Sequence, residues 1–122
     1  MVYQKKSIIG LITGLAIMSS SIIVAAEAGK QLSTIELGKK LAFTRKKGNC
    51  LACHMIVGGE SPGTIAPPLI AMKSRYPDKA TLKEQIWDAS LKNPETIMPV
   101  FGRFEVLTDK EINQLVDYIY SL

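Results

Sequence analysis

Both cysteines of this chain and its only histidine lie within one run of five residues, Cys50-Leu51-Ala52-Cys53-His54. The spacing C-x-x-C-H is typical of covalent haem c attachment. Two thiols one short turn apart can bond to the two vinyl groups of a haem, and the histidine beside the second thiol then lies under the porphyrin as an iron ligand. The run therefore predicts one covalent haem c, around which the rest of the chain must fold.

Three other uses of this cysteine pair are weaker hypotheses. A disulfide between Cys50 and Cys53 is possible in an oxidising compartment. A thioredoxin-like redox pair needs a strand–helix–strand setting, and no strand-rich segment precedes Cys50. A zinc site needs further ligands, usually from a second Cys or His pair, which the sequence lacks. We therefore favour haem attachment.

The second axial position of the iron needs a ligand other than histidine, because His54 is the only one. Methionine is the usual choice in cytochromes c. Met55 follows His54 too closely to reach the opposite haem face. Met72 lies in a short segment just after a proline-rich loop and is the weaker of the two remaining candidates. Met98 lies in a turn-rich loop that Pro94 and Pro99 restrict, which suits a rigidly held ligand. We predict Met98 as the ligand, with a core-filling role as its alternative.

The first 28 residues have the layout of a secretory signal peptide. Lys5 and Lys6 precede an apolar run over 8–18, and a small-residue cleavage site ends at Ala28. We expect removal of 1–28, a single domain over 29–122, and a periplasmic location, where bacteria attach haem covalently. The alternative is an uncleaved anchor, because the stretch 7–28 is long enough to span a bilayer.

Composition excludes several other classes of protein. A chain of 122 residues allows one domain at most, and 47% hydrophobic residues exclude a disordered polar tail. Two cysteines are too few for a disulfide-rich scaffold. The formal net charge of +4 is mild and gives no argument for nucleic acid or anionic lipid as a partner.

Three capping signals predict three helices. Ser33 and Glu36 form an S-x-x-E box before a helix over about 34–44. Similar T-x-x-E boxes begin at Thr81, before a helix to about residue 91, and at Thr108. The last helix carries an apolar stripe at helical spacing: Ile112, Leu115, Val116 and Ile119.

The segments between these helices predict a loop-rich middle. We expect a short helical turn around 50–54, and Pro62-Gly63 and Pro67-Pro68 mark a long loop. The fold class is therefore all-α. A small chain with so much loop is marginally stable without help, so we expect the apoprotein to be poorly folded.

These features together resemble the class I cytochromes c, and more narrowly the SoxX family, the monohaem subunits of SoxAX complexes in bacterial sulfur oxidation. The matching segments cover nearly all of the mature chain: 48–54, 62–69, 93–99 and 107–118. The resemblance implies a single small helical domain of the class I cytochrome c fold, wrapped around one covalent haem c.

The resemblance also implies a role for each site residue. Cys50 and Cys53 would bind the haem covalently, and His54 and Met98 would be the axial iron ligands. The backbone carbonyl of Pro67 would accept a hydrogen bond from the ring N–H of His54, which orients this ligand. Trp87 and Arg103 are weaker candidates for contacts with the haem propionates. The alternative for Trp87 is that its side chain packs in the core.

In the SoxX family, the partner is a larger SoxA cytochrome subunit. The SoxAX complex is an L-cysteine S-thiosulfotransferase that oxidatively links thiosulfate to a cysteine of the SoxYZ carrier, and a small acceptor cytochrome takes the electrons. We predict no catalytic residue in this chain, because it has no third cysteine and no second histidine. It would be the electron-accepting subunit.

A free-standing periplasmic cytochrome c that carries electrons to a terminal oxidase is the main alternative, and a haem sensor is a third. A permanent subunit buries an apolar patch on its partner, whereas a shuttle surrounds its haem edge with charge. Arg45-Lys46-Lys47 would suit such a charged ring, or is a solvated helix end.

Overall fold

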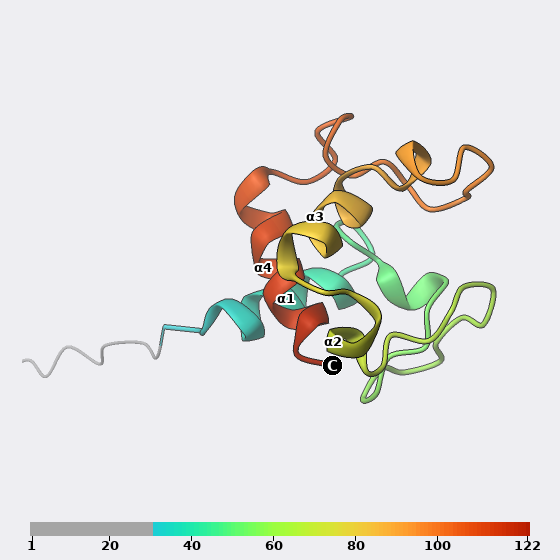
Figure 1. Cartoon of the computed structure of the whole chain (residues 1–122). Coiled ribbons are helices and arrows are strands. Elements are labelled where there is room, and N and C mark those ends of the chain that lie inside the picture. Colours follow the sequence, from blue (N-terminus) through green and yellow to red (C-terminus); the bar gives the residue numbers. More distant parts are fainter. Residues whose placement is uncertain (1–30) are drawn as a thin grey trace, which may run out of the picture.

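The computed structural model describes residues 31–122, so the predicted signal peptide over 1–28 lies outside the described residues. Within 31–122 the chain consists of helices, turns and loops without a strand, which confirms the all-α prediction (Figure 1). The elements in chain order are α1 (Thr34–Phe43), η1 (Cys50–Ala52), α2 (Met72–Arg75), α3 (Lys79–Trp87), η2 (Ala89–Leu91) and α4 (Asp109–Tyr120).

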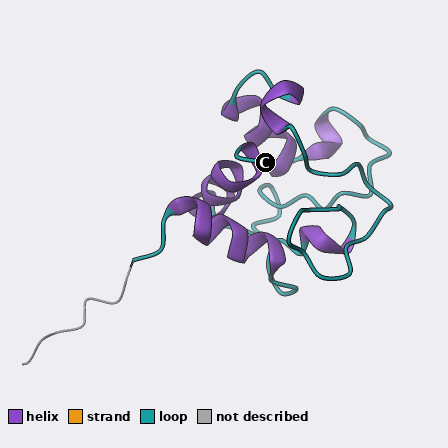
Figure 2. Ribbon diagram, turned by 90° about the horizontal axis from the view of Figure 1, so that it is seen from below, coloured by secondary structure: helices purple, strands orange, loops and turns teal. Residues whose placement is uncertain are grey.

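Helices α1 and α4 cross in close contact, and Gly38 makes this possible (Figure 2). A Cβ atom at Gly38 would lie only 1.9 Å from the backbone oxygen of Gln114, so no larger residue fits without moving α4. The rings of Phe43 and Tyr118 meet edge to face, with 6.1 Å between their centroids. This crossing fixes the first helix against the last.

Helix α4 forms as its sequence predicts. Thr108 accepts a hydrogen bond from the backbone N–H of Glu111, and the Glu111 carboxylate accepts one from the backbone N–H of Thr108 at 2.9 Å. Lys47 lies 2.7 Å from the same carboxylate, which ties the loop after α1 to the start of α4. The predicted apolar stripe is buried against α1 and α3: Ile112, Leu115, Val116 and Ile119.

Both predicted bounds of the second helix, Thr81 and about residue 91, are wrong, because α3 runs from Lys79 to Trp87 and residues 89–91 form the separate η2. Helix α3 begins at Lys79, and its N-cap is Asp78, whose carboxylate accepts a hydrogen bond from the Thr81 backbone N–H at 2.7 Å. Thr81 is therefore the third helical residue and not the cap. The helix ends at Trp87 because Asp88 adopts an extended backbone, and its carboxylate accepts from the backbone N–H of Ser90 to cap η2.

The core lies where α1, α3 and α4 meet, and α2 extends it. Met72 of α2 is buried, and its backbone N–H donates to the Leu122 carbonyl at 3.0 Å, which ties α2 to the end of the chain. The long loops lie beside this helical group (Figure 2). No helix within residues 31–122 has the length and apolar character needed to cross a membrane.

Candidate functional site

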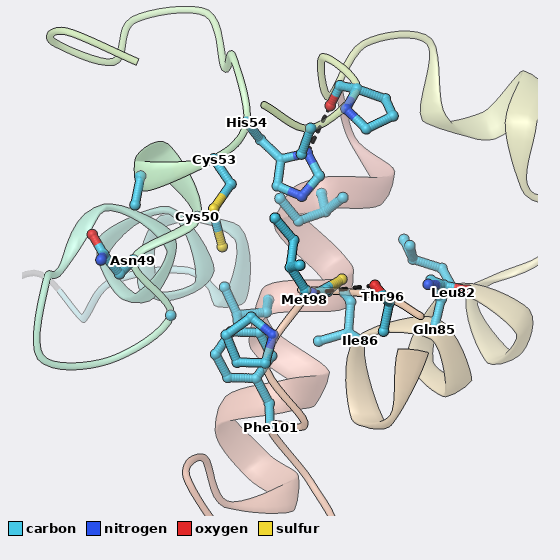
Figure 3. Close-up of a pocket in the computed structure, with 18 of the residues that line it drawn as sticks. Asn49, Cys50, Cys53, His54, Leu82, Gln85, Ile86, Thr96, Met98 and Phe101 are labelled. Carbon is cyan, nitrogen blue, oxygen red and sulfur yellow. Dashed lines mark hydrogen bonds between the residues drawn. The ribbon is translucent and has the colours of Figure 1, made fainter. Parts of the chain in front are cut away.

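A cavity of about 590 Å³ opens between the helical group and the loops. This volume is within the range of sites that hold organic cofactors. All five residues that the sequence singles out for the site line it: Cys50, Cys53, His54, Pro67 and Met98. Figure 3 shows the two cysteines, His54 and Met98 arranged around one space, although Met98 comes from a separate segment of the chain.

The walls of the cavity are mostly apolar and come from the core. The apolar residues that line it on α3, α4 and the loop before α4 are Leu82, Ile86, Leu115, Ile119 and Phe101. These side chains are buried and belong to the hydrophobic core. The cavity is therefore suited to a large, flat, apolar group that completes the core from one side.

A tight turn brings Cys50, Cys53 and His54 together. Asn49 enters the turn with a left-handed backbone at φ 48°, and η1 follows it. The Cys50 carbonyl then accepts two backbone hydrogen bonds, from Cys53 at 3.2 Å and from His54 at 2.8 Å. Both thiols consequently face one side of the turn, and neither is in a disulfide.

Burial changes the acidity of one of these thiols. Desolvation raises the pKa of the Cys50 thiol from its ordinary value of 9.0 to about 11, because the charged thiolate loses contact with water. Cys50 is therefore a neutral thiol at physiological pH. It is available for covalent attachment to a cofactor, but it is not an activated nucleophile.

The Pro67 carbonyl holds the His54 ring. The distance from His54 Nδ1 to Pro67 O is 2.6 Å, and a carbonyl only accepts, so Nδ1 carries the proton. Nε2 is then the nitrogen with a free lone pair, which is the one able to bind a metal. A backbone acceptor of this kind fixes the orientation of a ligating imidazole and increases its basicity.

The segment around Pro67 is itself fixed to the cysteine turn. The backbone N–H of Ala66 donates to the Cys53 carbonyl at 3.1 Å, and that of Leu69 donates to the Met55 carbonyl at 2.9 Å. From the other side, Arg75 of α2 donates through Nη1 to the Pro68 carbonyl at 2.7 Å. The acceptor for His54 is therefore held from both sides.

Met98 is presented by a loop with its own hydrogen bonds. The Asn93 carbonyl accepts from the Thr96 backbone N–H at 3.0 Å, and the Asn93 side chain accepts from Glu95 at 3.2 Å. The Thr96 hydroxyl oxygen then accepts from the Met98 backbone N–H at 3.2 Å, as Figure 3 shows. These turns hold the backbone from which Met98 reaches the cavity.

The other two methionines that follow the predicted signal peptide lie elsewhere. Met72 is buried in the core, where it packs under Arg75, and it does not line the cavity. Met55 is exposed and also lies outside the cavity lining. Met98 is therefore the one methionine within residues 31–122 that the fold brings to this space.

The expectation for Trp87 and Arg103 is not supported, because neither residue lines the cavity. The Trp87 ring instead lies against Gly102, where a Cβ atom would come within 1.8 Å of it. Arg103 forms an ion pair with Asp88, with 3.0 Å between Nη1 and Oδ2. The Trp87 side chain therefore packs within the protein, as the alternative interpretation of this residue predicts.

No motif singles out the other polar residues of the cavity wall. They are Asn49, Arg75, Tyr76, Gln85, Asn93, Glu95 and Thr96. Besides His54, Arg75 is the one basic residue of the lining, and Glu95 is its one acidic residue. No motif marks Arg75 in the sequence, since it reaches the cavity only through the one-turn helix α2, which the sequence did not predict.

The residues present fit a covalently bound haem. Free thiols lie on one wall, an imidazole with an available Nε2 and a thioether also line the cavity, and most of the remaining surface is apolar. The donor set of one imidazole and one thioether is the one used by cytochromes c.

The chain belongs to the cytochrome c family, because the sequence model of that family matches residues 35–122. Membership implies covalent haem c and a role in electron transfer, and the helical structure agrees with the class I cytochrome c fold. Among solved structures, it is similar to a chain of SoxXA from P. pantotrophus, with 27% sequence identity and a TM-score of 0.66. The match covers 75% of this chain and 83% of that one.

This similarity confirms the resemblance that the sequence suggests: the chain is a SoxX-like cytochrome. No curated protein sequence matches it closely enough to count as a relative.

Proposed function

We propose that this chain is the electron-accepting haem subunit of a SoxAX-type complex. Cys50 and Cys53 would hold one haem c covalently, and His54 Nε2 and Met98 Sδ would ligate its iron. The bound haem would supply transfer of one electron at a time. The Pro67 carbonyl keeps His54 in the ligating tautomer, and the methionine thioether favours a high reduction potential.

The partner subunit and the carrier protein perform the sulfur chemistry. A carrier thiol and thiosulfate join in a new S–S bond, with release of one proton and two electrons. This chain offers no nucleophile for that step, because its cysteines bind the haem and its histidine binds the iron. Its contribution is an apolar site that accepts the electrons one after the other and passes them to a small acceptor cytochrome.

The surface around the cavity favours a permanent subunit over a free electron shuttle. Ile65 and Ile97 line the cavity and are 69% and 75% exposed. Exposed apolar side chains at the edge of a redox site suit a stable protein interface, whereas a shuttle docks through charge. None of the three residues 45–47 lines the cavity, and Lys47 is already paired with Glu111.

The location follows from the same proposal. Residues 1–28 act as a signal peptide, the domain over 29–122 is exported, and haem attachment and electron transfer take place in the periplasm. The charged n-region, apolar run and small-residue cleavage site of the N-terminal segment support this.

Complex formation tests the proposal. Holoprotein tagged at its C-terminus is isolated from cells grown on thiosulfate, and a co-purifying larger cytochrome is identified by haem staining and mass spectrometry. We expect a one-to-one complex, which Ile65→Lys/Ile97→Lys disrupts. The matched control is Val57→Lys, at a residue that is 78% exposed but outside the cavity lining.

Recovery of a terminal oxidase in place of the larger cytochrome would favour the shuttle. Equal loss of the complex in Val57→Lys would show that the cavity edge is not the interface.

A further inference from the structure

Asp88 is a buried carboxylate at the start of the loop that carries Met98. The residue is only 1% exposed and lies between α3 and η2. One oxygen, Oδ1, accepts from the backbone N–H and the hydroxyl of Ser90. A carboxylate removed from water in this way is costly unless a positive charge compensates it.

Arg103 supplies this positive charge from the far end of the same loop. Its Nη1 lies 3.0 Å from Asp88 Oδ2, and Nη2 reaches the Ser90 hydroxyl at 3.5 Å. Within residues 31–122 Oδ2 makes no hydrogen bond, so the ion pair is its only compensation. Loss of Arg103 would therefore leave a buried charge unpaired.

The ion pair joins the two ends of the Met98 loop. A second link lies beside it, where the backbone N–H of Gly102 donates to the Trp87 carbonyl at 2.9 Å. From η2 to the start of α4 the loop has no regular secondary structure to hold it in place. Its position relative to the cavity consequently depends on how its two ends are joined.

We propose that the Asp88–Arg103 ion pair positions Met98 for iron ligation. Asp88 and Arg103 are positioning residues, because neither lines the cavity and both act through the loop. This inference rests on the proposed His54/Met98 ligation. When the ion pair is broken, the loop opens more often, and a small external ligand replaces Met98 more easily.

Imidazole binding to the ferric holoprotein measures how often Met98 leaves the iron. We expect Arg103→Met to tighten the apparent binding of imidazole by about tenfold or more, because a buried charge loses its partner. Arg103→Lys keeps the charge and should recover most of the wild-type value. The control Lys92→Met breaks an exposed pair with Glu84, and should change binding by less than about twofold.

A double variant separates positioning of the loop from general destabilisation. Asp88→Asn/Arg103→Met removes both charges, so most of the thermal stability should return. Imidazole binding should nevertheless stay tight, because the ion pair no longer joins the two loop segments and only the backbone hydrogen bond from Gly102 to Trp87 remains. If imidazole binding returned to the wild-type value together with stability, the inference would be overturned. If the wild-type spectrum lacked the methionine–iron band, the ligation itself would be wrong instead.

Discussion

Met98 and His54 come from distant segments, and each is held by a backbone contact that leaves its donor atom free. The His54 ring is fixed through Nδ1 by Pro67, and Met98 is fixed through its backbone by Thr96. The side-chain donors, Nε2 and Sδ, take no part in these contacts. Each potential ligand is therefore oriented before a metal binds, which is the purpose of such supporting contacts.

At the scale of single residues, Met98→Ala tests whether Met98 is an iron ligand. We expect the variant to lose the low-spin histidine–methionine spectrum, and its reduction potential to fall by on the order of 0.1 V or more, because axial ligands set the potential. The measurements are the absorption spectrum and a redox titration of the holoprotein.

Met72→Leu is the matched control for that prediction. Met72 lies in the core away from the cavity, so its spectrum and potential should stay close to wild type. If Met98→Ala kept both properties, or if Met72→Leu lost them, Met98 would not be the ligand.

The sequence alone was enough to predict those site residues that belong to a recognisable motif. C-x-x-C-H marks Cys50, Cys53 and His54 because their chemistry demands a fixed spacing, and the prolines around Met98 mark its loop. It could not predict that Arg103 pairs with Asp88. That pairing depends on which groups the fold brings together across a loop, and the spacing of residues in the sequence does not reveal it.

At the scale of elements, two of the three capping boxes that the sequence marks form as predicted. They are those that begin at Ser33 and at Thr108. Ahead of α3, the sequence offers Asp78 as well as Thr81, three residues apart. The earlier cap forms because the Asp78 carboxylate accepts from the Thr81 backbone N–H at 2.7 Å, and it places Lys79 in the helix, where Nζ lies 2.6 Å from Asp117 of α4.

The cap of α4 has a pH dependence that can be measured. The hydrogen bond from Lys47, together with that from the backbone of Thr108, holds the pKa of the Glu111 carboxyl below its ordinary value of 4.5. A pKa lowered by folding stabilises the folded state above the unfolded pKa, and this contribution is lost as the pH falls through the folded value.

Glu111→Gln should therefore lower the free energy of unfolding by about 0.5–1 kcal/mol at pH 7. The difference from wild type should shrink as the pH falls through the lowered pKa of Glu111, because both proteins then carry a neutral side chain. Urea unfolding over a pH series measures it, with the exposed Glu60→Gln as control. A difference that grew as the pH fell would contradict the role of the ionised carboxylate.

For the whole molecule, the cavity is part of the core, so folding and haem attachment are coupled. Without haem, the apolar walls of this cavity would face water, which costs about 25 cal/mol for each Å² of apolar surface. The chain without haem is therefore expected to be much less stable than the holoprotein.

Cys50→Ala/Cys53→Ala tests this coupling, because it removes both attachment points. We expect weak, non-cooperative thermal unfolding by circular dichroism. The Met98→Ala holoprotein, which keeps its covalent haem, should still unfold cooperatively. Native-like cooperative unfolding of the double cysteine variant without haem would show that the helices fold independently of the cofactor.

The most direct test of the account is reduction of this chain's haem by thiosulfate under anaerobic conditions. The holoprotein is mixed with the larger cytochrome and the thiol-bearing carrier, and its absorption spectrum is followed after thiosulfate is added. We predict reduction in the complete mixture only, and none when the larger cytochrome or the carrier is omitted. No reduction in the complete mixture, or equal reduction without the larger cytochrome, would contradict the proposed function.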